Sequence, residues 1–320
     1  KNAYKFFQEY LQAFPDGSYT TISQYYSILY EINKKSKFSL GIKKKVASFF
    51  ERNPISYYSL LMARRFPSVY NPIAKSFFDF KPSEKQLDIK IQDLSLNVSG
   101  YARVFEELKG FELYDDTLSV LLKMRRISSD KKTHLFLIKS FEEVKRLDQV
   151  VIQSMIFFNS KSESRDEIAL QKTFPLFEKN LIDSILKEKK ITSFDTPLVL
   201  SLIRQESAFY SKAESPVGAK GLMQLMPRTA KEVAKKEGLK TYYLEDEKDN
   251  MTLGISYLNK LVNEFGNKAY ALSAYNAGPH RVRKWLKKRK GLSSEEYVEL
   301  IPYKETSLYV KLIFRNYTVY

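Results

Sequence analysis

The sequence predicts an all-α protein in two parts, an α-superhelical region over residues 1–172 followed by a second helical domain over residues 173–320. Apolar residues recur at helical spacing along most of the chain, and no segment shows sustained strand-like alternation. Four glycines occur in the first 200 residues, against seven in the last 120. We therefore expect helical packing in the front and shaped loops in the back.

The first predicted helices follow one another with short breaks. One amphipathic stripe ends at Pro15-Asp16-Gly17, and a second runs from Ile22 to Ile32, which predicts a helical hairpin. We expect a third helix at about Leu40 to Arg52 and a fourth that Pro54 opens. Successive helix pairs without a fixed repeat favour a superhelix, although an irregular bundle would leave the same trace.

The boundary between the two parts is expected near residue 172. Residues 159–166 form a polar stretch with the composition of a linker. A chain of 320 residues also exceeds the usual size of one small domain, which favours two.

Charge and residue usage limit the possible chemistry. The net charge of +16 would attract any polyanion, whether nucleic acid, an acidic membrane face or the carboxylates of cell-wall peptides. The one dense basic run, Arg281 to Lys290, is typical of a solvated helix face, although Trp285 interrupts it. The chain has no cysteine, which excludes disulfides, thiolate metal sites and a cysteine nucleophile. His134 and His280 are the only histidines, so a multi-histidine metal site or a Ser-His-Asp triad is poorly supported, and we predict no metal.

No stretch of the sequence predicts a transmembrane segment. The longest apolar runs, such as Leu135 to Ile138, are far shorter than the ~20 residues that a bilayer requires. No apolar leader precedes Lys1, so we expect a processed or shortened form of the protein.

Glu206 is the strongest candidate for catalysis. Thr196 and Pro197 are a suitable N-cap and first-turn pair for an apolar helix, and steps of four from Leu198 reach Leu202 and then Glu206. The apolar stripe and the negative end of the helix dipole should both raise the pKa of this carboxyl. A carboxylic acid that stays protonated near neutral pH is what a glycosidic leaving group requires. The competing interpretation is a structural glutamate, paired for example with Arg204.

Four motifs surround this glutamate in the second part. Glu206-Ser207 is followed by Gly221-Leu222-Met223-Gln224, then by Ala274-Tyr275-Asn276-Ala277-Gly278, and finally by Ile301-Pro302-Tyr303-Lys304-Glu305-Thr306. Glycines that allow close approach of the backbone alternate here with single polar side chains that can orient a sugar, which is typical of a lined cleft.

These motifs, in this order, resemble those of the soluble lytic transglycosylases, whose catalytic domain has a goose-lysozyme-like fold. The resemblance covers about residues 174–320 and implies that Glu206 is the catalytic acid and base. The front region is similar only through its helices and a Tyr-Tyr-x-Leu-Leu segment at residues 57–61. The substrate-binding residues that the resemblance implies are Ser207 beside the catalytic glutamate, Met223, Gln224 and Met226 in the cleft wall, Tyr275 and Asn276 at the sugar next to the scissile bond, Glu305 near the peptide-bearing end, and Tyr309 in a Tyr-Val pair.

Two positions depart from the family pattern. Lys220 stands where a small residue is expected, and Ser307-Leu308 stands where an Arg-Gly pair is common. These departures affect the expected peptide contacts and leave the residues expected to carry the chemistry in place.

The resemblance implies a peptidoglycan lytic transglycosylase in the periplasm. Such an enzyme cleaves the MurNAc-β-1,4-GlcNAc bond with a single glutamate and leaves a 1,6-anhydroMurNAc end, without a cofactor. The expected partners are peptidoglycan strands and proteins of cell-wall synthesis or remodelling, and no nucleic acid. One alternative is a muramidase in which Asp246, Glu247 or Asp249 supplies a second carboxylate. The other is a non-catalytic module that binds cell-wall polymer or another polyanion through its basic charge.

Overall fold

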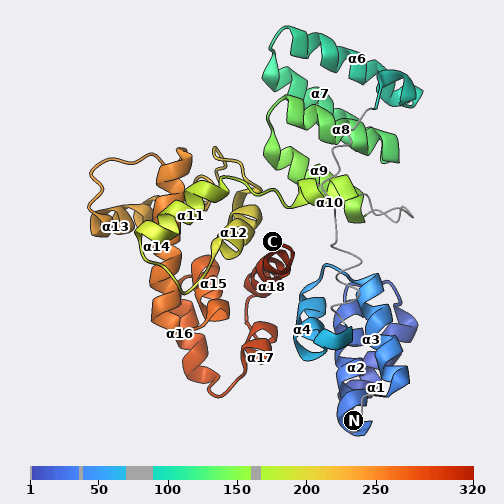
Figure 1. The fold of residues 1–320 in the computed structure, drawn as a ribbon, viewed down its shortest axis with the longest axis vertical. Helices are drawn as coiled ribbons and strands as arrows, with labels where there is room; N and C mark the ends of the chain where they lie inside the picture. The colour runs from blue at the N-terminus through green and yellow to red at the C-terminus, as the bar shows by residue number, and fades with distance from the viewer. Residues whose placement is uncertain (1, 36–38, 70–88, 160–166) are drawn as a thin grey trace. The chain divides into compact units, whose positions relative to one another are not determined.

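A computed structural model describes residues 2–35, 39–69, 89–159 and 167–320 (Figure 1). The described residues are mainly helical, and the only extended pairings among them are two isolated bridges that join Lys220 to Glu214 and to Leu225. The all-α prediction is confirmed. Two compact units divide the chain: residues 1–81 with 310–319, and residues 82–309 with Tyr320. The predicted boundary near residue 172 stays a prediction, and residues 160–166 of the expected linker lie outside the described residues.

The first unit is built from a short series of helices and the end of the last helix. The helices are α1 (Asn2–Ala13), α2 (Thr20–Lys35), α3 (Leu40–Arg52) and α4 (Tyr57–Arg65), joined by residues 310–319. The third helix has the bounds expected from the sequence. The fourth starts later than predicted, because the hydroxyl of Ser56 accepts a hydrogen bond from the Ser59 amide at 3.0 Å and caps the helix, which leaves Pro54 outside it.

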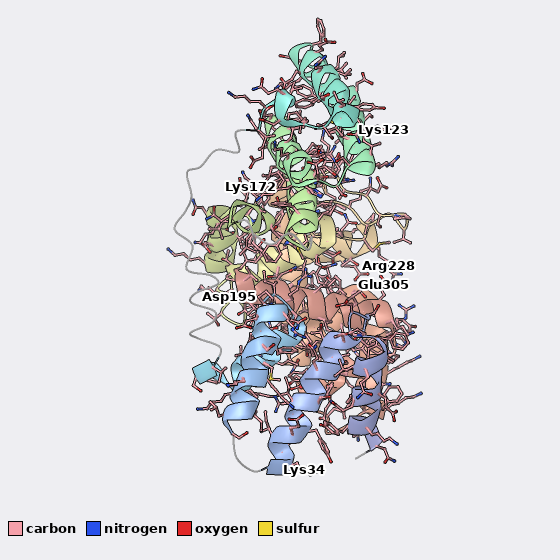
Figure 2. All side chains as sticks on the ribbon, turned by 90° about the vertical axis from the view of Figure 1, so that its right-hand side faces the viewer. Lys34, Lys123, Lys172, Asp195, Arg228 and Glu305 are labelled. Carbon is pink, nitrogen blue, oxygen red and sulfur yellow. The ribbon has the colours of Figure 1, made fainter. Side chains whose placement is uncertain are left out.

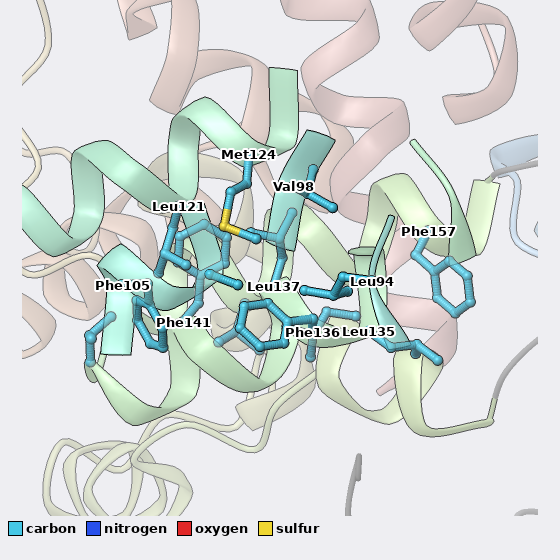
Figure 3. Packing of buried hydrophobic residues seen from close by; sticks show 14 of the residues in the cluster. Leu94, Val98, Phe105, Leu121, Met124, Leu135, Phe136, Leu137, Phe141 and Phe157 are labelled. Carbon is cyan, nitrogen blue, oxygen red and sulfur yellow. The ribbon is translucent and has the colours of Figure 1, made fainter. Parts of the chain in front are cut away.

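The second unit begins with helices that pack in sequence order, each against the next. They are η1 (Ile91–Asp93), α6 (Leu96–Gly110), α7 (Tyr114–Ile127), α8 (Lys131–Glu143), α9 (Leu147–Asn159) and α10 (Glu167–Thr173). Figure 3 shows their shared core, in which Phe105, Leu121, Leu137 and Phe141 are fully buried. Burial of this much apolar surface is the main source of stability for these helices, since short isolated helices are marginal in water.

The rest of the second unit carries the four motifs. Its helices are α11 (Lys179–Glu188), α12 (Thr196–Ser207), α13 (Pro227–Glu237), α14 (Glu247–Phe265), α15 (Lys268–Ala277), α16 (Pro279–Lys288), α17 (Ser294–Glu299) and the start of α18 (Lys304–Val319). The longest of them, α14, packs against α11, α13 and α15. It therefore forms the support on which the motif-bearing segments rest.

Basic side chains project from both units, among them the labelled Lys34, Lys123 and Arg228 (Figure 2). The positive charge is thus spread over the surface of each unit. Within the described ranges, no helix combines the length and the apolar character needed to cross a membrane.

Candidate active site

Glu206 lies in the last turn of α12. Asp195 caps the start of this helix, where its carboxylate accepts a hydrogen bond from the Leu198 amide at 3.3 Å. The N-cap is therefore Asp195 and not Thr196 as the sequence suggested, because Thr196 already has helical geometry and its hydroxyl donates to Asp183 instead. The helix ends at Ala208, where the backbone turns left-handed with φ of 49°.

The carboxyl of Glu206 is shielded from water, although the residue as a whole is only partly buried. Burial raises its pKa from an ordinary value of 4.5 to about 7, against the opposing effect of the Tyr309 hydroxyl, which donates a hydrogen bond to Oε1. An ion pair with Arg204 does not hold it in place. The Arg204 guanidinium lies 4.7 Å from the Phe174 ring, and its Nε donates to the Thr173 carbonyl at 2.9 Å. With its pKa raised this far, Glu206 keeps a protonated population near neutral pH, as a general acid requires.

Two tyrosines share the environment of this carboxyl. Burial and the charge of Glu206 raise the pKa of Tyr275 and of Tyr309 well above the usual value of 10.0. Both hydroxyls therefore stay protonated and act as hydrogen-bond donors. Tyr309 donates to Glu206, and Tyr275 donates to the carbonyl of Met223 at 2.8 Å.

Three side chains from distant positions hold the segment Leu222–Met223 beside Glu206. Ser207 donates to the Leu222 carbonyl at 2.8 Å, and Tyr275 donates to the Met223 carbonyl. The Met223 amide donates to Oδ1 of Asn250 at 2.8 Å. Asn250 is itself fully buried on α14, and its Nδ2 donates to the Lys220 and Leu244 carbonyls at 3.0 and 2.8 Å. This loop is therefore fixed by side-chain hydrogen bonds rather than by regular secondary structure.

Two glycines allow this close packing. A Cβ at Gly221, where φ is +76°, would lie 2.1 Å from both the Leu244 carbonyl oxygen and Nδ2 of Asn250. A Cβ at Gly254, one turn after Asn250 on α14, would lie 2.3 Å from Sδ of Met223. Neither position tolerates a side chain without movement of the loop.

Three other residues expected at the site, Met223, Gln224 and Met226, lie in the segment that leads into α13. Gln224 has a left-handed backbone with φ of 46°, and its Nε2 donates to the carbonyls of Ala213 and Gly221 at 3.0 and 2.9 Å. The side chain of Met223 is fully buried, whereas Met226 is 41% exposed. The roles of these residues toward a sugar stay predictions.

Asn276 and Glu305 lie at the junction of α15 and α18. Oδ1 of Asn276 accepts a hydrogen bond from the Thr306 hydroxyl at 2.6 Å, which ties the two helices together. Glu305 precedes Thr306 and is exposed to solvent (Figure 2). No hydrogen bond or ion pair within the described ranges links Glu305 to Glu206. The structure therefore gathers Glu206, Ser207, Tyr275 and Tyr309 into one contact network and leaves Glu305 outside it.

Two of the three carboxylates considered as a second catalytic group accept hydrogen bonds from backbone amides. Asp246 is the N-cap of α14 and accepts from the Asp249 amide at 2.9 Å, and Asp249 accepts from the Tyr243 amide at 2.8 Å. Glu247 follows in the same first turn, so all three residues belong to the start of α14. Among the described residues, no second carboxylate contacts Glu206, and no group of acidic or histidine side chains is placed to hold a metal ion.

Sequence reasoning missed the clamp formed by Asn250. An available signal was a single polar residue, four positions before a glycine, on an otherwise apolar helical face. The hydrogen bond between Tyr309 and Glu206 left no local signal, since 103 residues separate them.

Comparisons with known proteins agree on one family. Residues 183–298 match the family model described as the transglycosylase SLT domain. The soluble lytic murein transglycosylase of Salmonella typhimurium is 40% identical over 148 residues, which are 44% of this chain and 22% of that protein. The chain thus corresponds to a minor part of the length of this relative.

Solved structures match over most of the chain. The 70 kDa soluble lytic transglycosylase of Escherichia coli has a TM-score of 0.69 at 25% identity, over 93% of this chain and 45% of that one. The lytic transglycosylase Slt of Pseudomonas aeruginosa has a TM-score of 0.72 at 23% identity, over 98% of this chain and 48% of that one, and shares the fold. Residues 183–298 thus match the transglycosylase SLT domain, and in this part the chain is similar to soluble lytic murein transglycosylases.

Proposed function

We propose that this protein is a peptidoglycan lytic transglycosylase that cuts the MurNAc-β-1,4-GlcNAc bond with Glu206 as its single acid and base. The observation that carries the proposal is the isolated Glu206 carboxyl, with a pKa of about 7 and a tyrosine hydroxyl as its partner. The matched relatives are named for this activity, which supports the substrate class.

The first step needs an acid. Glu206 in its protonated form donates its proton to the bridging oxygen while the bond from that oxygen to C1 of MurNAc breaks. The hydrogen bond from Tyr309 to Oε1 orients the carboxyl, so that the other oxygen is available to carry the proton toward the substrate. The N-acetyl group next to C1 stabilises the positive charge that develops there.

The second step needs a base. Glu206, now ionised, takes the proton from the C6 hydroxyl of the same MurNAc, and the C6 oxygen forms a bond to C1. The products are a GlcNAc hydroxyl and a 1,6-anhydroMurNAc end, and Glu206 is again protonated. Because the attacking hydroxyl belongs to the substrate, this route needs no second carboxylate to position water.

Mass spectrometry of products from purified peptidoglycan tests the proposal. We expect strand ends that lack a reducing group and are lighter by one water than hydrolytic ends. The Glu206→Gln variant should remain folded and bind strands without cutting them, since an amide cannot deliver the proton. Ordinary reducing ends as the main product would instead support the two-carboxylate muramidase. Near-normal turnover by Glu206→Gln would show that another residue is the acid.

The same proposal places the protein's action at the cell wall, in the periplasm, with peptidoglycan strands as its partner. Proteins of cell-wall synthesis or remodelling are proposed as further partners. Fractionation of cells that produce a tagged form of the protein tests the compartment.

A further inference from the structure

The turn that follows Glu206 and Ser207 has an unusual backbone. Ala208 and Phe209 are both left-handed, with φ of 49° and 71°. One left-handed residue is common at the end of a helix, but a second one with a bulky side chain is an outlier. Such a conformation persists only where the surrounding structure holds it, and outliers of this kind gather at functional sites. The contacts of this turn therefore indicate what fixes the end of α12.

Hydrogen bonds join the turn to the loop beside Glu206. The hydroxyl of Ser207 accepts a hydrogen bond from the Phe209 amide at 3.2 Å and donates one to the Leu222 carbonyl at 2.8 Å. The Tyr210 amide donates to the Ser207 carbonyl at 3.1 Å. The conformation of the turn thus affects where Ser207 and the loop lie with respect to Glu206.

Two aromatic side chains anchor the turn to other parts of the second unit. The ring of Phe209 is buried and lies 5.4 Å from the Phe177 ring. The ring of Tyr210 lies under the guanidinium of Arg146, with 4.6 Å between Cζ of Arg146 and the ring centroid. A cation over an aromatic ring is attracted to it, more strongly where water is partly excluded. Tyr210 is therefore held by a residue that comes just before α9, on the earlier helices of the unit.

Arg146 is itself held in one orientation. Its Nε and Nη2 donate to the two carboxylate oxygens of Asp148 at 2.8 and 2.7 Å. Asp148 is buried, and its Oδ2 also accepts from Nε2 of Gln149 at 2.7 Å. Oε1 of Gln149 accepts in turn from Nη1 of Arg125, on α7, at 3.0 Å. A bidentate pair that is supported in this way fixes the plane of the guanidinium, and so the face that the Tyr210 ring can occupy.

The charge of Arg146 does not set the protonation of Glu206. Burial and the hydrogen bond from Tyr309 determine the pKa of that carboxyl. The groups whose own pKa responds to the charge of Glu206 are Tyr275 and Tyr309. An effect of Arg146 on the reaction must therefore pass through the position of the turn.

We propose that Arg146 is a positioning residue for strand cleavage, which holds Tyr210 and thereby the left-handed turn that keeps Ser207 and Glu206 in place beside the loop. The inference rests on the proposed function. Because Arg146 precedes the matched residues 183–298, it gives the earlier helices a part in the reaction. These helices then act as a support for the end of α12.

Matched substitutions in the full chain separate positioning from general stability. Arg146→Met removes the charge and keeps an unbranched side chain. The control is Lys109→Met, since Lys109 makes comparable contacts within the core of the earlier helices, 5.0 Å from the Phe105 ring and 2.7 Å from Glu143. Tyr210→Leu removes the ring but leaves Arg146 paired, so it tests the contact even if Arg146→Met does not fold. Tyr210→Phe keeps the ring.

We expect Arg146→Met and Tyr210→Leu each to lower kcat for strand cleavage about tenfold and to change KM less than about twofold. A looser turn would admit water to the Glu206 carboxyl and lower its pKa, so the alkaline limb of the pH–rate profile should move to lower pH by about half a unit. Tyr210→Phe and Lys109→Met should keep the kcat and the limb of the parent. The double variant of Arg146→Met and Tyr210→Leu should be no slower than either single variant, because both remove the same contact.

A Tyr210→Leu variant with the kcat and the alkaline limb of the parent would overturn the inference. Equal losses of rate in Arg146→Met and Lys109→Met, with the limb unmoved, would overturn it too, because the effect would then be one of stability alone. Failure of the proposed function would remove the inference as well, and it is recognised separately, since the parent itself would then produce no 1,6-anhydroMurNAc ends.

Discussion

Shielding of the Glu206 carboxyl from water links its proposed role in catalysis to the stability of the fold. Its folded pKa of about 7 lies above the ordinary value of 4.5, so the protonated form favours folding and the ionised form opposes it. The contribution of this group to stability is fully present below about pH 4.5 and is lost as the pH rises toward 7.

The first prediction follows from this sign. At pH 7 the Glu206→Gln variant should melt at a higher temperature than the parent. Its free energy of unfolding should be larger by roughly 3 kcal/mol. The gap should shrink as the pH falls to about 4.5, where both side chains are neutral. Thermal unfolding across this range measures it, and Glu305→Gln is the control because that carboxyl is exposed. An unchanged or lower melting temperature at pH 7 would mean that Glu206 is stabilised by a charged partner.

Tyr309 is predicted to set the working pH of the reaction. Its hydrogen bond lowers the pKa of Glu206, in opposition to burial, so Tyr309→Phe should raise that pKa further. The alkaline limb of the pH–rate profile should then move to higher pH, and the maximum rate should fall roughly tenfold because the carboxyl loses its orientation. A purely structural role for Tyr309 would lower the rate without moving the limb.

At the scale of elements, the loop before α13 depends on Asn250 and on the space at Gly221. The buried amide of Asn250 satisfies the Met223 amide and the carbonyls of Lys220 and Leu244. Loss of such a partner leaves buried polar groups without hydrogen bonds, each of which costs about 1–3 kcal/mol. The loop therefore keeps its conformation only while it stays in contact with α14, the helix that carries Asn250.

Two glycines in the same loop form a matched test. Gly218 and Gly221 both have left-handed backbones, at φ of +83° and +76°, but only at Gly221 would an added Cβ meet backbone within 4 Å. Gly218→Ala should cost about 1 kcal/mol in stability through its backbone conformation alone. Gly221→Ala should cost roughly 3 kcal/mol and reduce strand cleavage, because the loop must move away from Leu244. Denaturant unfolding and cleavage rates of both variants measure this, and equal effects would refute the packing argument.

At the scale of the whole molecule, α18 belongs to both compact units. Its first residues, through Tyr309, are in the unit that contains Glu206, whereas residues 310–319 are in the unit of the first helices. Within that first unit, the ring of Phe314 lies 6.4 Å from that of Tyr57. Removal of the first helices would therefore expose one face of a helix whose start holds Tyr309.

A fragment of residues 174–320 is predicted to fold with reduced stability. It retains every motif residue but loses the helices against which residues 310–319 pack. We expect a lower melting temperature than that of the full chain and binding of a hydrophobic dye to the exposed face. Phe314→Ser in the fragment should reduce the dye binding. A fragment as stable as the full chain, without dye binding, would show that the first unit contributes nothing to α18.

The sequence by itself determined the helical class, the bounds of α3 and the position of Glu206 at the end of an apolar helix, because each follows from residues close together in the chain. Once α12 forms, steps of four residues place Leu198, Leu202 and Glu206 on the same face of the helix. The four motifs, read in order, indicated the family resemblance. Only the tertiary structure decided what surrounds that carboxyl. The hydrogen bond from Tyr309 to Glu206 and the one between Met223 and Asn250 each join segments far apart in the sequence, and such contacts depend on how helices pack rather than on local periodicity.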